Sequence, residues 1–255
     1  ALYASGYLLF MRGKTLLAQA FDEASLELSG DPFTVAEEAI NDPGFNLAVF
    51  SASQNGVLAY QTGTGLAGAR MMVVDRTGKE LGLVGDVIEN FVPRLSPDGK
   101  RLMVSIFEPK SRTQNLWVYD LMRNARIRFT TGLSTDFSPV WSPNGSRIVF
   151  WSGRKETFGI YVRSAEGGGA EETLCSLKEQ AGPTDWSRDG RHIVFQQLSG
   201  SQNDIWIIPL SGDKKPYPYL QTQFNEGQAR FSPDGRWMAY MSNETGQPEV
   251  FVRPF

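Results

Sequence analysis

Residues 96–99 read Ser-Pro-Asp-Gly, and three close copies of this tetrapeptide follow along the chain. The copies are Ser142-Pro143-Asn144-Gly145, Ser187-Arg188-Asp189-Gly190 and Ser232-Pro233-Asp234-Gly235, so the turn glycines are 46, 45 and 45 residues apart. Each copy follows a large apolar residue and precedes a hydrophobic run. A fixed period of this length is typical of chains assembled from repeated supersecondary units.

The residue types of the tetrapeptide predict a tight turn between two strands. Proline presets φ for the turn, aspartate or asparagine bonds its own backbone, and glycine supplies a positive φ. Two weaker copies lie upstream, where Gly6 and Gly56 each precede a hydrophobic run without the same tetrapeptide. We therefore expect six repeats, of which the first two have a different turn.

Further strands follow each of the six turns. A second hydrophobic strand begins near Thr15, Arg70, Asn115, Gly159, Asp204 and Glu249. A weaker last strand closes most repeats, for example at residues 172–177. Each repeat thus reads strand a, turn, strand b, loop, strand c, turn, strand d. Four-stranded units of about this size bury both faces when they stack radially.

The predicted fold is all-β: a β-propeller of about six four-stranded blades. A single propeller is expected over residues 1–255, with blades at about 1–45, 46–90, 91–135, 136–181, 182–226 and 227–255. The last blade lacks its outer strand, because Phe255 comes directly after strand c, and Ala1–Ser5 reads as strand a of the first blade. We expect the natural chain to continue, or the last blade to offer an unpaired edge for self-association.

The composition of the chain argues against nucleic acid as a binding partner and against a membrane span or an internal disulfide. The formal charge is −3 with no basic cluster, which argues against nucleic acid. No apolar run is long enough for a membrane helix, so no membrane span is expected within the chain. The single cysteine, Cys175, excludes an internal disulfide.

The repeated turns and the apolar strands after them resemble those of TolB-like, WD-repeat-like propellers. Residues 7–38 and 242–255 resemble, more narrowly, the propellers appended to bacterial serine/threonine protein kinases of the acidobacterial type. That resemblance implies an accessory domain, placed beyond a membrane helix and so extracytoplasmic or periplasmic. The TolB resemblance implies recognition of a protein or peptide. The sequence holds no kinase motif, so no catalytic residue is transferred.

The sequence offers little for catalysis. His192, the only histidine, occupies a repeat position that holds Arg101, Arg147 or Trp237 elsewhere, which indicates a structural role. Cys175 lies between leucines in a predicted strand d. One histidine and one cysteine make zinc implausible, and Asp136, Asp204 and Glu244 are scattered along the chain, so we expect no metal and no cofactor.

We therefore predict a non-catalytic binding or sensor propeller for a protein or a small polar ligand. Two alternatives remain open. One is an enzyme domain, in either of two forms. The first form is a propeller hydrolase resembling a glycosidase, with Asp136 and Asp185 as carboxylates at strand a entrances. The second form is the gating propeller of an oligopeptidase, although the Gly-x-Ser-x-Gly motif of its hydrolase is not present in this sequence. The other is a purely architectural propeller, which predicts no polar pocket at the channel mouth.

Binding is expected where the loops differ most between repeats. The Ser-Pro-Asp-Gly turns share one face with the c–d turns, whereas the variable b–c and d–a connections share the other. The b–c loops are 61–69, 108–114, 153–158, 199–203 and 243–248, and the d–a entrances include 41–46, 136–137, Asp185 and 225–228. The candidate ligand-binding residues are Arg94, Asp136, Asp185, Arg230, Arg112 and Arg154.

Overall fold

The fold was determined from a computed structural model of the 255-residue chain. The structure describes residues 2–39, 41–42, 47–48, 50–53, 55–62, 69–75, 79–88, 90–108, 110–123, 125–154 and 157–255. These residues form 25 strands and no helix, and accordingly no helix in the described chain could span a membrane. The chain divides into two compact units, Ala1–Thr130 and Thr131–Phe255.

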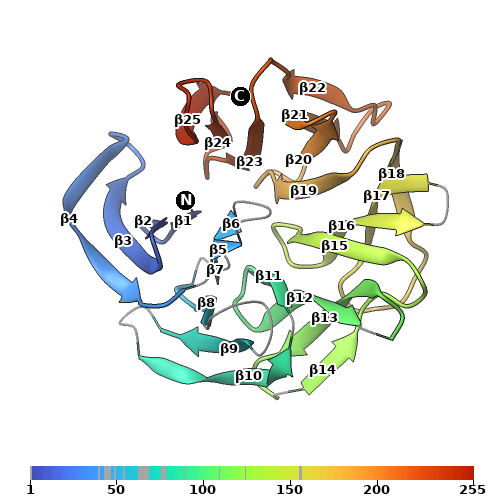
Figure 1. The fold of residues 1–255 in the computed structure, drawn as a ribbon, viewed down its shortest axis with the longest axis horizontal. Helices are drawn as coiled ribbons and strands as arrows, with labels where there is room; N and C mark the ends of the chain where they lie inside the picture. Colours follow the sequence, from blue (N-terminus) through green and yellow to red (C-terminus); the bar gives the residue numbers. More distant parts are fainter. Residues whose placement is uncertain are drawn as a thin grey trace. The chain divides into compact units, whose positions relative to one another are not determined.

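The first unit holds three four-stranded antiparallel sheets and one small hairpin (Figure 1). In sequence order the strands of the three sheets are β1 (Leu2–Ala4), β2 (Tyr7–Arg12), β3 (Thr15–Asp22) and β4 (Glu27–Ala36); β7 (Phe50–Ala52), β8 (Leu58–Thr62), β9 (Ala69–Val74) and β10 (Glu80–Ile88); and β11 (Asn90–Leu95), β12 (Arg101–Glu108), β13 (Thr113–Asp120) and β14 (Ala125–Arg128). The hairpin pairs β5 (Asn41–Asp42) with β6 (Leu47–Ala48), a feature that the repeat pattern did not predict.

The second unit holds two four-stranded sheets and one three-stranded sheet. Their strands are β15 (Thr135–Trp141), β16 (Arg147–Arg154), β17 (Thr157–Ser164) and β18 (Glu172–Leu177); β19 (Ala181–Trp186), β20 (His192–Ser199), β21 (Gln202–Pro209) and β22 (Tyr217–Leu220); and β23 (Glu226–Phe231), β24 (Trp237–Ser242) and β25 (Glu249–Pro254). The first strands of these sheets, β15, β19 and β23, lie next to one another.

Six small antiparallel sheets in sequence order make the fold a six-bladed β-propeller, as predicted. In the described chain the last blade has three strands, also as predicted. The proposed blade boundaries and the self-association through β25 stay predictions.

Hydrogen bonds around the turn serine explain the tetrapeptide. Ser187 Oγ donates to Asp189 Oδ1 (2.6 Å) and accepts from the backbone N–H of His192 (2.8 Å). Asp189 Oδ1 also accepts from the N–H of Arg191 (3.0 Å), and Gly190 has a positive φ of 76°. Equivalent bonds are made at Ser96, Ser142 and Ser232. The side chains therefore hold strands a and b in one register.

The second blade has a shorter version of this turn, as expected, because its serine accepts from the backbone N–H four residues on, and not five. Ser53 Oγ donates to Asn55 Oδ1 and accepts from the backbone N–H of Val57 (3.0 Å). The N–H of Gly56 donates to the carbonyl oxygen of Ser53, as in the other copies. Serine, an Asx residue and glycine are thus sufficient, because neither a proline nor an aspartate is needed for these contacts.

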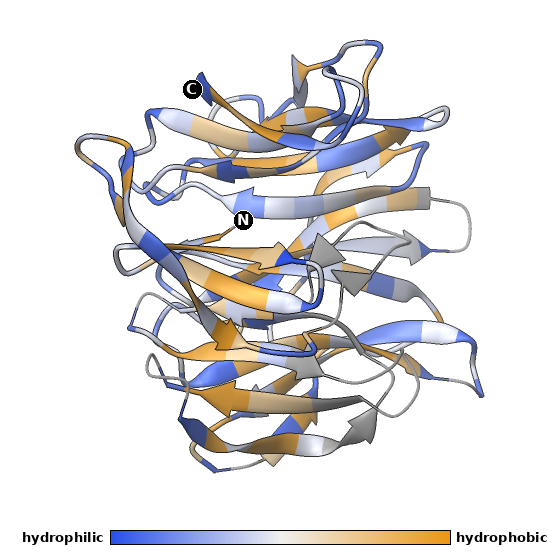
Figure 2. Cartoon of the chain, turned by 60° about the vertical axis from the view of Figure 1, so that its left-hand side comes forward, coloured by the Kyte–Doolittle hydropathy of each residue, from blue (hydrophilic) through white to orange (hydrophobic). Residues whose placement is uncertain are grey.

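The sheets pack through their middle strands (Figure 2), where hydrophobic residues concentrate. In the second unit one cluster joins Val149 and Ile160 with Trp186, Ile193 and Phe195 from the next blade. Strands b and c carry an equivalent stacked aromatic pair in each blade of this unit: Phe150–Tyr161, Phe195–Trp206 and Tyr240–Phe251. The periodic aromatic residues of strand c therefore belong to the core.

Replacing Ser187 with alanine should lower the free energy of unfolding by about 1 kcal/mol, because the buried hydroxyl both donates to Asp189 and accepts from His192. Urea unfolding measures the change. Ser201→Ala at an exposed position is the control and should have little effect. Equal stability of Ser187→Ala and the wild type would contradict the structural role of the turn.

Replacing Asp234 with asparagine should weaken the acid dependence of stability. Hydrogen bonds from Ser232 and Arg236 lower the pKa of Asp234 from 3.8 to about 2. A lowered pKa in the folded state gives stability that is present above 3.8 and is lost as pH falls toward 2. Asn144 shows that an amide can hold this turn. The variant should therefore be less stable than wild type near neutral pH, and equal to it near pH 2, in urea titrations; a constant difference would contradict this assignment.

Candidate functional site

Polar side chains gather at one end of the sheets in the second unit. We call this the loop end: the first residues of β15, β19 and β23, together with the β16–β17, β20–β21 and β24–β25 connections and the chain that enters each blade. The Ser-Pro-Asp-Gly turns lie at the opposite end of the same strands. Asp136 pairs with Ser152 across β15 and β16, and Glu226 pairs with Ser242 across β23 and β24. These two positions are equivalent in their blades.

Two predicted site residues, Asp136 and Arg154, are brought together at the loop end of the fourth blade. Asp136 is buried and accepts from Ser152 Oγ (2.5 Å) and from Ser134 Oγ (3.3 Å). Arg154 Nε donates to the same Ser152 oxygen (3.3 Å). The Arg154 guanidinium also pairs with Glu171 and lies 4.1 Å from the centre of the Tyr161 ring. All of these charged groups are already engaged by the protein.

Asp185 and Arg230 are also brought together, but not at the loop end. Asp185 Oδ2 accepts from the backbone N–H of Phe231 (2.9 Å), and Asp185 Oδ1 lies 3.8 Å from Arg230 Nη1. Asp185 is the fifth residue of β19, so the expectation that it lies at a strand entrance is wrong. The equivalent of Asp136 in this blade is Ala181, because each lies eight residues before its turn Asx residue. Asp185 therefore links neighbouring blades and does not face Asp136 as a second catalytic carboxylate.

The first unit holds the remaining predicted site residues. Arg94 is half-buried on β11 and its Nη1 donates to the carbonyl oxygen of Pro93 (3.4 Å). Arg112 is exposed in the β12–β13 connection, with a left-handed φ of 55°. Its backbone N–H donates to the carbonyl oxygen of Glu108 (2.8 Å), so a short turn fixes its position.

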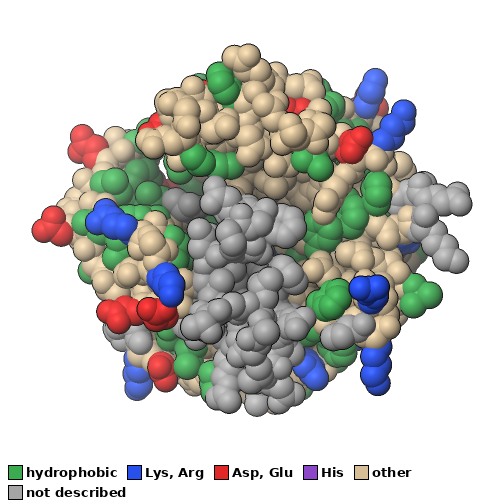
Figure 3. All heavy atoms as spheres, viewed as in Figure 1, with side chains coloured by type: hydrophobic (Ala, Val, Ile, Leu, Met, Phe, Trp, Pro, Cys, Tyr) green, Lys and Arg blue, Asp and Glu red, His purple; other side chains and the backbone are tan. Residues whose placement is uncertain are grey.

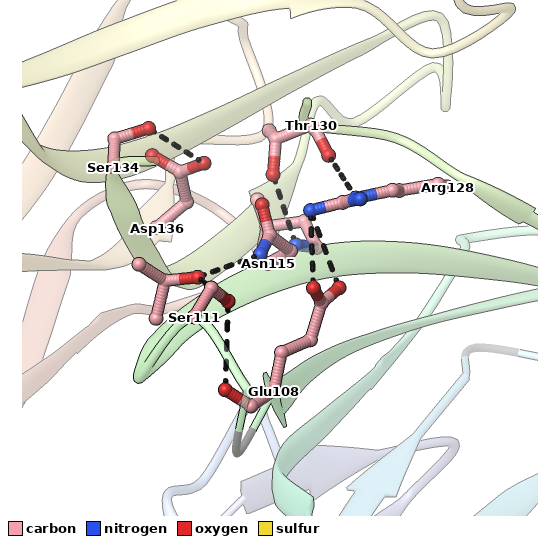
Figure 4. A network of polar contacts seen from close by, with 9 residues as sticks. Glu108, Ser111, Asn115, Arg128, Thr130, Ser134 and Asp136 are labelled. Carbon is pink, nitrogen blue, oxygen red and sulfur yellow. Dashed lines mark hydrogen bonds and ion pairs between the residues drawn. The ribbon is translucent and has the colours of Figure 1, made fainter. Parts of the chain in front are cut away.

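A polar network surrounds the loop end of the third blade (Figure 4). Arg128 Nη2 pairs with Glu108 (3.2 Å), and Arg128 Nε donates to the carbonyl oxygen of Thr130 (3.0 Å). Asn115 is fully buried and donates to Thr113 Oγ1 (3.3 Å). Its Oδ1 accepts no hydrogen bond from any residue that the structure describes.

The clearest candidate site is an acidic cluster of Asp204, Glu226 and Glu244 in the second unit. Two consecutive residues hold its buried members: Gln221 Nε2 donates to Asp204 Oδ2 (3.0 Å), and Thr222 Oγ1 donates to Glu226 Oε1. Glu244 is exposed, and its backbone N–H donates to the oxygen of Ser242, the partner of Glu226 in the sheet (3.2 Å). The three carboxylates of the cluster thus come from β21, from β23 and from the β24–β25 connection, in that order.

Glu226 is the most unusual residue of the cluster. Its side chain is 0% exposed, and its Oε2 accepts no hydrogen bond within the described chain. Burial raises the pKa of the Glu226 carboxyl above 4.5, and the charges of Asp204 and Glu244 raise it further, against a lowering by the Thr222 hydrogen bond. Perturbed carboxyls of this kind are typical of functional sites.

Three asparagines order the loops beside the cluster. The backbone N–H and the side-chain amide of Asn203 both donate to Asn225 Oδ1 (2.9 and 3.1 Å). The N–H of Asn225 donates in turn to Asn243 Oδ1 (2.8 Å). This ladder connects the start of β21, the entrance to β23 and the β24–β25 loop, so the loop end is held in place before any ligand binds.

Strand a bends just inside the loop end. The register of β15 shifts between Phe137 and Val140, and that of β23 shifts between Gly227 and Arg230. Ser138 and Gln228, at equivalent positions, have left-handed φ values of 53° and 55°. Non-glycine residues with this conformation are strained and concentrate at binding and active sites.

The sequence alone pointed to the loops of this site but not to its central residue. Glu226 appeared only within the entrance segment 225–228, and Asp204 and Glu244 were judged scattered. That judgement concerned metal ligands together with Asp136, and no metal-holding group is found in the described chain, but the charges of Asp204 and Glu244 do raise the pKa of Glu226. One signal was available: Glu226 stands eight residues before Asp234, as Asp136 does before Asn144.

The described residues offer little support for a nucleophilic cysteine, a catalytic histidine or a metal site. Burial raises the pKa of the Cys175 thiol to about 11, which opposes thiolate formation. His192 packs edge-on against the Phe255 ring (5.3 Å between centroids), at the turn end of β20. In the described part of the chain no group of three or more His, Cys, Asp or Glu side chains is arranged to hold a metal ion. Among the coloured side chains of Figure 3, basic and acidic groups are dispersed.

Comparison with known families supports the repeat and the sheet topology. The family model described as the TolB beta propeller domain matches residues 58–215, more than half of the chain. The chain belongs to the TolB β-propeller domain family. Its relatives include the Tol-Pal system protein TolB of Francisella tularensis, 30% identical over 157 residues, which are 61% of this chain and 36% of that protein.

Other relatives of this TolB-family propeller are associated with enzymes. The uncharacterized peptidase YuxL of Bacillus subtilis is 25% identical over 195 residues, which are 60% of this chain and 29% of that protein. The chain thus spans only about a third of the length of these curated relatives. The relatives of this chain therefore include both a Tol-Pal system protein and a protein named as a peptidase.

Solved structures share the fold. The TolB structure from Acinetobacter baumannii has a TM-score of 0.73 at 20% identity and covers 95% of this chain and 58% of its own. An oligogalacturonate lyase in complex with manganese has a TM-score of 0.70 at 15% identity, and the match covers 98% of this chain and 74% of the lyase chain. At these identities the likeness concerns the fold alone.

Replacing Glu226 with glutamine should stabilise the protein near neutral pH. A raised pKa in the folded state gives stability that is present below 4.5 and is lost as pH rises through the folded-state pKa, so the neutral amide avoids this loss. Urea unfolding should show a gain near neutral pH that vanishes well below pH 4.5. Glu172→Gln, at an exposed carboxylate paired with Lys214, is the control. A gain that did not change with pH would show that the buried charge is not its cause.

Proposed function

We propose that this propeller is a non-catalytic recognition module that binds a protein or peptide at its loop end. The observation that carries the proposal is the acidic cluster, in which Glu226 is buried beside Asp204 with a carboxylate oxygen that the described chain leaves without a donor. Protein folding alone does not favour such an arrangement, since a buried charge without a partner costs stability. A bound ligand supplies a reason to retain it.

The contrast between the two ends of the blades supports this location. The turn end carries five copies of one hydrogen-bonded turn, which offers a partner almost the same chemistry in each blade. The loop end differs from blade to blade: Arg154 with Glu171 in the fourth, Asn203 and Asp204 in the fifth, and Glu226 and Glu244 in the sixth. Different groups at equivalent positions give a surface that can discriminate between partners.

The setting of the domain is a further part of the proposal. The resemblance of residues 7–38 and 242–255 to kinase-appended propellers supports an accessory role in a larger bacterial protein, with the propeller on the extracytoplasmic side. The match to TolB supports a role in protein recognition. In this setting the propeller senses or docks a partner, and any catalysis belongs to another domain.

An enzymatic role is the second candidate, favoured by two observations. A carboxyl with a raised pKa beside a second carboxylate is a pattern seen in general acid catalysis, and Glu226 with Asp204 matches it. The match to a peptidase and the structural likeness to prolyl endopeptidases also favour a propeller that accompanies a hydrolase. The complete burial of Glu226 counts against general acid catalysis, because a general acid must reach its substrate.

Charge reversal at the loop end should weaken binding of the partner. The variant Arg154→Glu alters the loop end of the fourth blade, and binding of the protein recovered with the wild-type domain should fall at least about tenfold in a titration. The control Arg188→Glu/Arg191→Glu alters exposed residues at the turn end and should bind normally. Normal binding by the first variant and lost binding by the second would place recognition at the turn end. Hydrolysis of a glycoside or peptide by the purified domain would favour the enzymatic role.

A further inference from the structure

The outer strand of the last blade, β25, exposes apolar residues that the two preceding blades bury. Phe251 in β25 corresponds to Tyr161 and Trp206, because each ring forms the same stacked pair with strand b of its blade. The two neighbours of Phe251, Val250 and Val252, are 61% and 57% exposed. The four apolar residues that flank Tyr161 and Trp206 are at most 2% exposed. The last blade therefore presents an uncovered apolar strand to solvent.

The pairing of β25 with β24 determines which backbone groups of β25 face outward. The N–H of Phe255 donates to the carbonyl oxygen of Arg236 (2.8 Å), and hydrogen-bonded pairs alternate along an antiparallel ladder. Every second residue, counted back from Phe255, therefore bonds to β24, and Val250 and Val252 direct their backbone groups away from it. These N–H and C=O groups have no hydrogen-bond partner among the residues that the structure describes.

We propose that the outer edge of β25 pairs with the same edge of a second copy of the chain, so that two propellers share one continuous sheet. In this arrangement the two β25 strands run antiparallel about a two-fold axis at Phe251. A contact of the same patch with itself closes after two copies. The inference concerns the outer edge of a blade and does not rest on the proposed function.

One register uses all of the outward-facing groups. With Phe251 on the axis, Val250 lies opposite Val252 of the second copy, and each such pair exchanges both of its hydrogen bonds. A shift of the register by two residues in either direction would place a valine opposite Pro248 or Pro254, and a proline has no N–H to donate. The two prolines thereby delimit the paired segment at both ends.

The charges of β25 are complementary in the same register. Glu249 and Arg253 are both exposed, and each lies two residues from the axis. Glu249 of each copy therefore lies opposite Arg253 of the other, at positions where opposing side chains approach most closely. Neither side chain forms an ion pair with a described residue. The shifted registers would instead place one of these charges opposite Phe251.

Contact between the valines adds apolar burial to the pairing. Val250 and Val252 lie on one face of β25, so the valines of both copies meet on one face of the shared sheet. Cross-strand pairs of β-branched residues stabilise a sheet. Charged residues and prolines also protect exposed strand edges from aggregation. The self-complementary order of Glu249 and Arg253 distinguishes a pairing edge from one that is only protected.

Sedimentation equilibrium of the 255-residue protein tests the association directly. A monomer–dimer equilibrium should appear at concentrations up to about 0.5 mM, because a short strand edge makes a small interface. Two-dimensional NMR over the same range should shift the amide signals of Val250 and Val252. Hydrogen exchange at both amides should slow as the protein concentration rises, since pairing protects them from water.

Charge reversal makes the register testable. Glu249→Arg places arginines opposite each other and Arg253→Glu places glutamates opposite each other, so each variant alone should associate at least about tenfold more weakly than wild type. An equimolar mixture of the two variants should form a heterodimer with restored affinity, because all of its opposing charges are again unlike. The control Arg188→Glu, at an exposed position in a turn, should associate as wild type does. Thermal unfolding shows whether each variant is folded.

Three results would overturn the inference: a wild-type protein that stays monomeric up to this concentration, a dimer whose affinity neither charge reversal changes, or folded Glu249→Arg and Arg253→Glu variants that do not associate when mixed. A monomer would assign the charges and prolines of β25 to the protection of an exposed edge. A dimer insensitive to both reversals would place the contact between copies on another surface.

Discussion

The hydrogen bonds of the turn serine are the constraint on which the rest of the molecule depends. In four blades this hydroxyl joins an Asx side chain to the first backbone N–H of strand b, and in the second blade it joins Asn55 to the N–H of Val57, just before strand b. The register of strands a and b is fixed there, and each residue along them is placed by its distance from the turn. Because strand a begins about eight residues before the Asx residue, Asp136 and Glu226 occupy the far ends of their blades. The position of the site is thus a consequence of the repeat.

The same regularity explains what the sequence can and cannot predict. A period of about 45 residues and a turn with definite φ requirements are local signals, so the sheets, their order and the three-stranded last blade follow from them. The turn at Ser53 was predicted to differ from the others, and it is one residue shorter, although its serine hydroxyl also joins an Asx side chain to a backbone N–H. The β5–β6 hairpin was not predicted because it interrupts the repeat and has no counterpart in other blades.

The candidate site depends on contacts that no local pattern records. Asp204 and Glu226 are 22 residues apart in sequence and are brought together by Gln221 and Thr222 in the connection between two blades. Asp185 resembled an entrance residue, but its carboxylate instead accepts the N–H of Phe231 and so joins adjacent strands. Charge and loop position pointed to the end of the blades at which Glu226 lies, whereas its burial, which distinguishes it from a solvated carboxylate, emerges only from packing. A buried charge without a partner costs stability, as the oxygen of Glu226 without a donor does here.

Amide hydrogen exchange of the domain, alone and with its bound protein partner, tests most directly the claim that the loop end is the recognition surface. Exchange reports the backbone of each segment separately, so the two ends of the blades are resolved in one experiment. The account predicts slower exchange on binding at residues 200–205, 222–228 and 243–248, with no change in the turns near residues 96–101, 142–147, 187–192 and 232–237. Protection of the turn segments with no change around Glu226 would contradict it.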